Sequence, residues 1–567
     1  MRFFRNRRVH EIAPDEIFLD SSNLPGRNDV QFEGRVVRPV STPALIGVGA
    51  VFALIVLAFV GRSFSLEVVS GASYAQISRD NRLERSIIFA TRGLIYDRTG
   101  KELAWNEAAP AAAGAASTTP FALRRYTSLP GFSHILGFVR YPRADAGGTW
   151  WREEYVGVSG AEHGFDSVLA GKNGSAMEET DAHGHVQSQG ITLPPQNGTD
   201  VHLSIDADVQ SKLFSLLSVH AKAQGFDGGA SVIIDVRTGE LLALVSFPEY
   251  DNAAFAAGNS AAVAAASKNP NSPLLERATS GLYAPGSIVK PIFASAALNE
   301  GIISPDKKIL STGAISIPNP YDKAHPSVFR DWTVHGWINM REALAVSSDE
   351  YFYTIGGGYG AQQGLGISRI DQYARLFGLA SSTGFTLLGE QTGVIPTPAW
   401  KEQVFGADDP WRIGDTYHTA IGQYGFQITP LQAARFVAAI ANGGKLLTPQ
   451  IIASSTPEYS EIGIPDSYLQ IVREGMRMAV TSMRTDATVK FLNIPGIDIS
   501  AKTGTAQIGT HNQWVNSWSV GFWPADTPHY AYATVLEKAP AGTQSGAAPG
   551  MLPFFEWLMS EHPEYLQ

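Results

Sequence analysis

The stretch Leu282–Pro291, LYAPGSIVKP, determines how the rest of the chain is interpreted. Pro285 and Gly286 break the backbone, and the apolar residues after them recur at helical spacing. Ser287 and Lys290 are three residues apart, so we expect them to share one helix face and to contact each other. This pairing suits nucleophilic catalysis, because a neutral amine can take the proton of a serine hydroxyl.

Lys290 must be neutral to act as a base, so its pKa would have to fall from about 10.4 toward 7. Burial and a second nearby cation would lower it, and Lys502 in the stretch AKTGTAQ is the candidate for that cation. The residues Ile497–Ala501 predict a strand with Lys502 at its end, and Gly504 would let another segment approach closely. We expect this to be an edge strand that pairs with an extended peptide.

Two further serine motifs need to be distinguished. The stretch Ser304–Lys307, SPDK, repeats the serine–lysine spacing, but its proline and aspartate favour a helix cap or a solvated loop. The stretch Ser347–Asp349, SSD, is typical of a polar break between helices. A Ser347 hydroxyl that faces Lys290 and Lys502 would relay a proton, which gives this second motif a catalytic interpretation.

The composition excludes several classes of function. The chain has 567 residues, 44% hydrophobic and 17% charged, which is long enough for several folding units. Its net charge of −10 gives no reason to expect nucleic acid as a partner. It has no cysteine, which excludes disulfides and cysteine metal sites, and its 13 histidines are scattered. We predict no metal or cofactor and expect His335, His418 and His511 to be structural or surface residues.

An uncharged segment of 23 residues, Pro39–Gly61, follows the N-terminal tail. As a helix it would extend roughly 35 Å, enough to cross a hydrocarbon core. No small-residue cleavage site follows it, so we predict an uncleaved membrane anchor rather than a signal peptide. Seven arginines precede the segment, which places the tail in the cytoplasm and the rest of the chain outside.

The patterning beyond the anchor predicts two outer domains. Short strands are expected around Ile87–Phe89 and Leu94–Tyr96, and the run Ala108–Ser117 is expected to be an exposed loop. The stretch Ala230–Phe247 predicts a β-hairpin about Thr238 and Gly239. Helices are predicted over Ile288–Asn299, Met340–Ile355, Ile367–Phe377, Pro430–Ala441 and Asp466–Thr481, and strands over Trp518–Phe522 and Ala531–Leu536. We therefore predict a mixed α/β catalytic domain.

Together these features predict four segments. They are a cytoplasmic tail (1–42), a transmembrane helix (43–64), a strand-rich pedestal (65–195) and a catalytic domain (196–567).

The ordered set Ser287-x-x-Lys290, Ser347-x-Asp349 and Lys502-Thr503-Gly504 resembles that of the penicillin-binding proteins and serine β-lactamases. Longer stretches, including RGLIYDRTGKELAWN, TGVIPTPAWK and GDTYHTAIGQYGFQITPLQ, resemble the class B penicillin-binding proteins. They are more similar to the elongation type than to the division type. The resemblance covers most of the chain.

This resemblance implies an anchored peptidoglycan D,D-transpeptidase with a penicillin-binding α/β fold on a pedestal. Ser287 would attack the D-Ala-D-Ala bond of a stem peptide and Lys290 would deprotonate it. The other implied roles are proton transfer to the leaving group by Ser347 and Lys502, substrate binding by Asp349, Thr503, Gly504 and Thr505, and an oxyanion hole from the backbone N–H groups of Ser287 and Thr505. β-Lactams would acylate the same serine, and a RodA-type (SEDS) glycan polymerase is the implied membrane partner.

The sequence departs from the family pattern in two places. Asp349 stands where most members have Asn, and an ionised carboxylate cannot donate the hydrogen bond of an amide. The span Asn106–Gly157 is short, so the pedestal is expected to lack a larger head. The alternatives that the motifs leave open are a division-type transpeptidase, a D,D-carboxypeptidase or β-lactamase, and a non-catalytic penicillin sensor.

Overall fold

The computed structural model describes residues 42–74, 82–109, 119–180, 186–319, 322 and 324–566. The chain folds as two units, residues 1–86 with 177–190 and residues 87–176 with 191–567. The predicted cytoplasmic tail, apart from Thr42, and most of the predicted Ala108–Ser117 loop lie outside the described residues.

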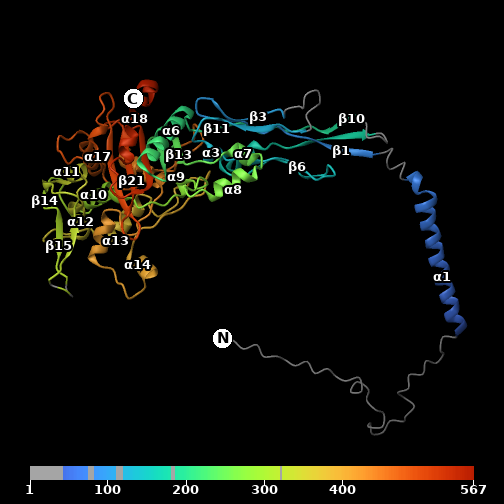
Figure 1. Cartoon of the computed structure of the whole chain (residues 1–567), viewed down its shortest axis with the longest axis horizontal. Coiled ribbons are helices and arrows are strands. Elements are labelled where there is room, and N and C mark those ends of the chain that lie inside the picture. Colours follow the sequence, from blue (N-terminus) through green and yellow to red (C-terminus); the bar gives the residue numbers. More distant parts are fainter. Residues whose placement is uncertain are drawn as a thin grey trace, which may run out of the picture. The chain divides into compact units, whose positions relative to one another are not determined.

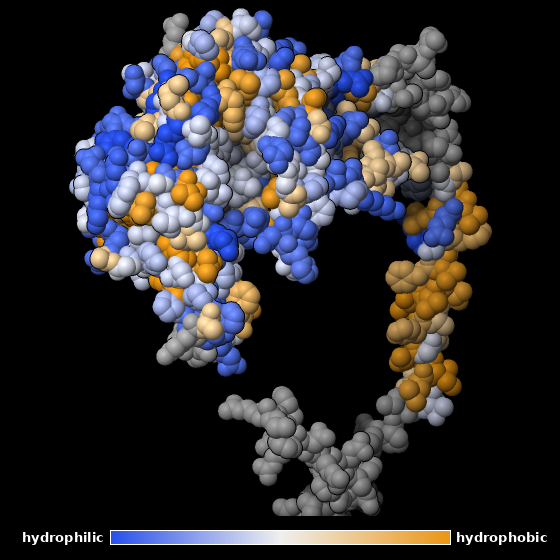
Figure 2. Space-filling view, turned by 60° about the vertical axis from the view of Figure 1, so that its left-hand side comes forward, coloured by the Kyte–Doolittle hydropathy of each residue, from blue (hydrophilic) through white to orange (hydrophobic). Residues whose placement is uncertain are grey.

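The first unit contains one long apolar helix, α1 (Thr42–Phe64), which continues as the π-helical segment η3 (Ser65–Val69) (Figure 1). Within this stretch of 28 residues, a window of 18 residues has a mean hydropathy of 2.7, and none of the stretch is buried. Its surface is almost continuously hydrophobic in Figure 2. The helix is therefore long and apolar enough to cross a membrane.

Small sheets form the strand-rich part of the chain between α1 and the larger sheet. One has the order β1-β9-β10 and another the order β11-β2-β3-β4. The predicted strands are present, although the first ends at Ile88 rather than Phe89. The elements of this part are β1 (Arg82–Ile88), β2 (Ile95–Tyr96), β3 (Glu102–Glu107), β4 (Leu123–Tyr126), α3 (Ser133–Leu136), β5 (Val139–Arg140), β6 (Arg143–Ala144), β7 (Trp150–Arg152), β8 (Val156–Gly157), α4 (Gly160–Gly164), α5 (Asp166–Leu169), β9 (Gly174–Thr180), β10 (Val186–Leu193) and β11 (Val201–His202).

A buried ion network joins these small elements. Glu162 in α4 accepts hydrogen bonds from Arg92 Nε and Arg124 Nε, each at 2.6 Å, and all three side chains are fully buried. Arg92 also pairs with Asp166 at 2.7 Å. Because each guanidinium meets a carboxylate, the network fixes the RGLIYDR segment against α4 and α5.

A five-stranded antiparallel sheet organises the second unit, in the order β13-β12-β22-β21-β20. Its strands are β12 (Gly228–Asp235), β13 (Leu241–Phe247), β20 (Ser500–Ile508), β21 (Trp514–Trp523) and β22 (Tyr530–Pro540). The first two form the predicted hairpin, and every residue of both is buried. Helices come between β13 and β20 in the sequence, so the predicted mixed α/β architecture is confirmed.

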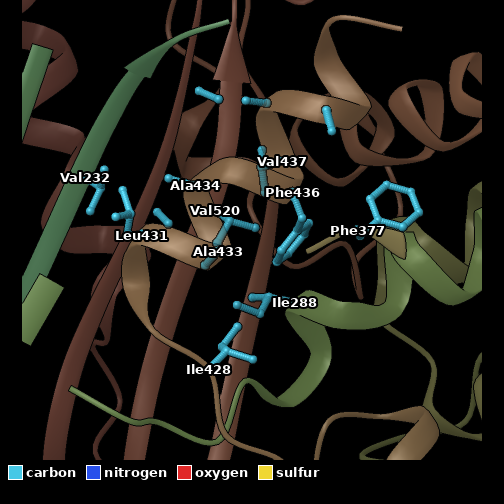
Figure 3. Close-up of a cluster of buried hydrophobic side chains, with 14 of the residues drawn as sticks. Val232, Ile288, Phe377, Ile428, Leu431, Ala433, Ala434, Phe436, Val437 and Val520 are labelled. Carbon is cyan, nitrogen blue, oxygen red and sulfur yellow. The ribbon is translucent and has the colours of Figure 1, made fainter. Parts of the chain in front are cut away.

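The sheet has a hydrophobic core on each face, because neighbouring strand residues point to opposite sides. On one face, Val232 of β12 and Val520 of β21 meet the fully buried helix α16 (Pro430–Ala441) and Ile288 (Figure 3). On the other face, Ile233 packs with residues of α6 (Ala207–Gln224) and α18 (Ala547–Glu561). Thr429 and Gln432 form a capping box, which explains why α16 begins where it does.

The remaining helices largely match their predictions. α13 (Gly366–Leu376) and α17 (Asp466–Thr481) agree closely with the sequence pattern. The predicted helix over Met340–Ile355 is two helices, α11 (Met340–Val346) and α12 (Asp349–Gly357), so the polar break expected at SSD is present. The other elements are α7 (Asn252–Ala256), α8 (Ser260–Lys268), α9 (Arg277–Ser280), η4 (Gly286–Val289), α10 (Lys290–Asn299), β14 (Ile309–Ser311), β15 (Ala314–Ile317), β16 (Ser327–Arg330), β17 (Gly336–Ile338), α14 (Pro398–Phe405), α15 (Ile413–Ala420), β18 (Lys445–Leu447), β19 (Tyr459–Glu461), η5 (Lys490–Leu492) and η6 (Pro563–Leu566).

Candidate active site

Ser287 lies in η4, a 3₁₀ turn that leads directly into α10. Gly286 has φ +54°, and its N–H donates to the Gly422 carbonyl at 2.9 Å. A Cβ on Gly504 would lie 2.7 Å from the Pro285 carbonyl oxygen, so glycine is needed where β20 meets this turn. The predicted close approach at Gly504 is therefore present, and the approaching segment is the one that carries the candidate nucleophile.

The Ser287 side chain is half-buried and lines a cleft of about 950 Å³. Its hydroxyl has no hydrogen-bond partner among the residues that the structure describes. The predicted contact with Lys290 is therefore not made as a hydrogen bond. The hydroxyl faces a space large enough for an extended peptide.

Lys290 is fully buried and points toward the break between α11 and α12. Its Nζ donates to the Ser347 carbonyl oxygen at 2.7 Å and forms an ion pair with Asp349 Oδ1 at 2.6 Å. The Ser347 hydroxyl lies at 3.5 Å from the same nitrogen. These two short contacts hold the Lys290 ammonium at the break between α11 and α12.

Ser347 has a left-handed backbone conformation, with φ +57° at the end of α11. Strain of this kind in a residue other than glycine persists only where neighbouring contacts fix it. Here the next residue, Ser348, caps α12 through Tyr351 N–H at 3.2 Å and donates to Asp331 at 2.6 Å. The left-handed residue thus presents both its carbonyl oxygen and its hydroxyl to buried lysines.

Lys502 is the third residue of β20, which runs from Ser500 to Ile508. The prediction of a strand over Ile497–Ala501 with the lysine at its end was wrong, because pairing with β21 extends the strand through the KTG motif. Lys502 is fully buried, and its Nζ donates to the Ser347 hydroxyl at 2.6 Å and to the Thr503 carbonyl at 2.8 Å.

The two lysines differ in their electrostatic partners. Burial, followed by the positive charge of Lys290, lowers the pKa of Lys502 well below its usual value, and the Asp349 carboxylate opposes this shift. We expected the lowered pKa at Lys290, with Lys502 as the perturbing cation. The lowered pKa of Lys502 has a visible cause, because Asp349 forms its ion pair with Lys290 and leaves Lys502 bonded only to neutral oxygens.

Strand β20 forms one wall of the cleft. It is an edge strand, as predicted, and Thr503, Thr505 and Gln507 all line the cavity because they alternate along one face. The Thr505 carbonyl oxygen lies beside Gly286, so the backbone of Thr505 faces the serine turn. This geometry brings together the expected substrate-binding threonines and the two expected oxyanion-hole residues, Ser287 and Thr505.

The cleft is also lined by residues to which the sequence analysis gave no catalytic role. Phe329, Trp332 and Tyr353 line the cleft, and so does His418, which we expected to be an ordinary structural residue. His418 belongs to the GDTYHTAIGQYGF stretch and is four residues from Gly422, which contacts the serine turn. This position was the signal in the sequence that could have placed His418 at the cleft. His335 is buried and bonded to Asp486 at 2.8 Å.

The described part of the chain places no group of three or more His, Cys, Asp or Glu side chains so that they could hold a metal ion. A serine that lines a cleft near two buried lysines, next to an edge strand that can hold a peptide, is typical of serine enzymes that transfer or hydrolyse acyl groups of peptides.

Comparison with known proteins shows which family within this class of serine enzymes the chain belongs to. The penicillin-binding protein transpeptidase domain matches residues 229–556, more than half of the chain, and the penicillin-binding protein dimerisation domain matches residues 113–203. The chain therefore belongs to the penicillin-binding protein transpeptidase family. Its relatives place it with the elongation-type class B members.

One relative is the peptidoglycan D,D-transpeptidase MrdA of Acinetobacter baumannii, 31% identical over 76% of this chain and 65% of that protein, just under two thirds of its length. MrdA of Escherichia coli is 27% identical over 85% of this chain and 89% of that protein. Among solved structures, the penicillin-binding protein PBP2 of Helicobacter pylori in complex with MreC gives a TM-score of 0.69 at 25% identity. The match covers 85% of this chain and 100% of that one.

Proposed function

We propose that this chain is a membrane-anchored peptidoglycan D,D-transpeptidase that cross-links stem peptides through an acyl-enzyme on Ser287 during cell elongation. The observation that carries this proposal is the convergence of Lys290 and Lys502 on Ser347, beside a serine whose hydroxyl faces the cleft. The family and its relatives support the same activity.

The proton path of acylation follows from the lysine contacts. The Lys290 ammonium passes a proton to Ser347, whose hydroxyl passes its own proton to the neutral Lys502. Neutral Lys290 then accepts the proton of Ser287 as its oxygen attacks the carbonyl carbon between the two D-alanines. The proton held by Lys502 returns through Ser347 to the departing D-alanine amine, so the lysine pair ends with its one extra proton on Lys290, as in the resting state.

The strand and the turn would hold the substrate during this step. The backbone N–H groups of Ser287 and Thr505 donate to the developing oxyanion, a contribution of about 2.7–4 kcal/mol per donor in comparable enzymes. The hydroxyls of Thr503 and Thr505 bind the terminal carboxylate of the stem peptide, and Gly504 keeps the strand close to the serine turn. Asp349 orients Lys290 through their ion pair.

The second half of the reaction joins two stem peptides. The amine of another stem peptide attacks the acyl-enzyme and restores Ser287. A β-lactam would acylate Ser287 in the same way as the donor peptide, and no cofactor is required.

The anchor and the partner complete the proposal. α1 crosses the cytoplasmic (inner) membrane with the N-terminus in the cytoplasm and the catalytic domain outside, as the arginines before it favour. The glycan strands would come from a RodA-type (SEDS) polymerase beside this chain, the membrane partner that the family resemblance implies.

Identification of the residue that penicillin modifies tests the nucleophile. We expect mass spectrometry of the full chain to find the adduct on Ser287, and Ser287→Ala to lose labelling by fluorescent penicillin. Labelling that persists in Ser287→Ala would refute the assignment. Incubation with lipid-linked precursor and the polymerase should then give cross-linked product, whereas rapid hydrolysis of the penicillin adduct with full recovery of activity would favour a carboxypeptidase or β-lactamase.

A further inference from the structure

His418 lines the same cleft as Ser287, yet it has no role in the proposed acylation step. Its imidazole makes no hydrogen bond to any residue that the structure describes. The ring packs against Phe329 at a centroid distance of 5.4 Å and against Tyr353 at 6.4 Å, and both of these residues also line the cleft. Aromatic packing thus fixes the ring while its nitrogens stay unbonded.

The backbone around His418 links it to the nucleophile. The His418 carbonyl oxygen accepts hydrogen bonds from Gln423 N–H at 2.9 Å and from Ile421 N–H at 3.3 Å, which shape the turn after α15. Gly422 in that turn accepts the hydrogen bond from Gly286 N–H at 2.9 Å. His418 is therefore placed by the same loop that holds the turn of Ser287.

Other basic groups in the cleft are already engaged. Lys290 is paired with Asp349, and Lys502 is bonded to Ser347. Burial acts to raise the pKa of Asp331, but the nearby His335 and the Ser348 hydroxyl lower it to about 2, so it is a weak base. Among the described residues that line the cleft, His418 is the neutral base without a bonded partner.

We propose that His418 accepts the proton of the acceptor amine when that amine attacks the acyl-enzyme, an inference that rests on the proposed transpeptidase function. The free amine nitrogen forms a bond to the acyl carbonyl carbon, and its N–H proton passes to an imidazole nitrogen of His418. The bond between that carbon and Ser287 Oγ then breaks, and Oγ takes a proton from the lysine pair through Ser347. His418 releases its proton to solvent, and the lysine pair takes one proton back from solvent.

The charges around the imidazole suit this role. Burial lowers the pKa of His418 below its usual value of 6.5, while Asp415 on the same helix and Asp349 on α12 oppose the shift. Arg330 and Asp331 line the same cleft, and Tyr353 of α12 packs edge-on against the ring. The neutral imidazole is thus available at pH 7, and the step should slow as the pH falls through the lowered pKa of His418, which lies below 6.5.

The test separates acylation from aminolysis in the full chain with its anchor. The probe is a thioester analogue of an acyl-D-alanyl donor, with D-alanine as the acceptor amine, and the products of aminolysis and hydrolysis are quantified by chromatography. Fluorescent penicillin measures acylation of Ser287 in the same preparation. His418→Gln removes the base, and His325→Gln, at a side chain that is 83% exposed, is the matched control.

We expect His418→Gln to keep penicillin acylation within threefold and to lower the aminolysis rate by about 100-fold, a usual loss for a general base. With aminolysis expressed per unprotonated amine and per acylated Ser287, the wild-type decline below pH 6.5 should disappear in this variant, and His325→Gln should behave as wild type. Unchanged aminolysis, an equal loss of acylation and aminolysis, or an unaltered pH profile would each overturn the proposal. Loss of acylation in the wild type would instead contradict the proposed function itself.

Discussion

Two buried networks of cations in this protein differ in how their charges are balanced. In the segment 87–176, Arg92 and Arg124 share Glu162, and Arg92 has Asp166 as well. Near the cleft, two fully buried lysines have only the Asp349 carboxylate close to them. Asp349 forms its ion pair with Lys290, and Lys502 is bonded to neutral oxygens.

The pKa values follow this difference in pairing. Although burial acts to lower the pKa of Arg92, Glu162 and Asp166 raise it above its usual value. At Lys502, burial and the charge of Lys290 prevail and the pKa falls. In the arginine network the carboxylates balance the buried positive charges, and this compensated network stabilises the fold. In the lysine network one carboxylate does not balance two buried cations, and this uncompensated network provides a neutral amine for proton transfer.

Replacing Lys502 by Arg should have the largest effect, because a guanidinium remains charged and cannot accept the Ser347 proton. We expect the rate of Ser287 acylation by fluorescent penicillin to fall by about 10²–10⁴-fold, with thermal unfolding close to wild type. Lys101→Arg, at an exposed ion pair, is the control for the change of cation. If Lys502→Arg were acylated at the wild-type rate, the two networks would not differ in function.

Glu162→Gln tests the compensated network. It leaves Arg92 and Arg124 buried with one carboxylate fewer, and we expect the free energy of unfolding to fall by about 3–5 kcal/mol. Lys101→Ala, which removes an exposed ion pair with Asp208, should cost at most about 1 kcal/mol. Denaturant unfolding measures both variants, and equal effects would contradict a structural role for the buried network.

Asp349→Asn has the smallest expected effect and sharpens the comparison within the cleft. Asp349 opposes the lowering of the Lys502 pKa, so its removal should lower that pKa further and extend the neutral form to lower pH. We expect the acid limb of penicillin acylation to move to lower pH. A shift to higher pH would show that the carboxylate does not act on Lys502 as the structure indicates.

The sequence predicted those parts of the fold and the site that local patterns control. Apolar spacing and caps located α16 and α17, and three short motifs identified Ser287, Ser347 and both lysines. What it did not predict depends on contacts between distant segments. Lys290 and Lys502 reach Ser347 across 57 and 155 residues of chain, so no local pattern showed which lysine would pair with Asp349.

His418 was missed for the same reason. The cleft around it forms only when Phe329 and Tyr353 come together from β16 and α12. The position of Lys502 within β20 was likewise set by pairing with β21 rather than by its own sequence.

The pH dependence of Ser287 acylation by penicillin in the wild-type full chain tests the central claim most directly. If Lys502 is neutral in the resting enzyme, the second-order rate constant should reach its plateau at a pH well below about 10.4, the pKa of an unperturbed lysine. Acylation that rises only as the pH approaches that value would contradict the account, because both lysines would then be charged in the resting enzyme.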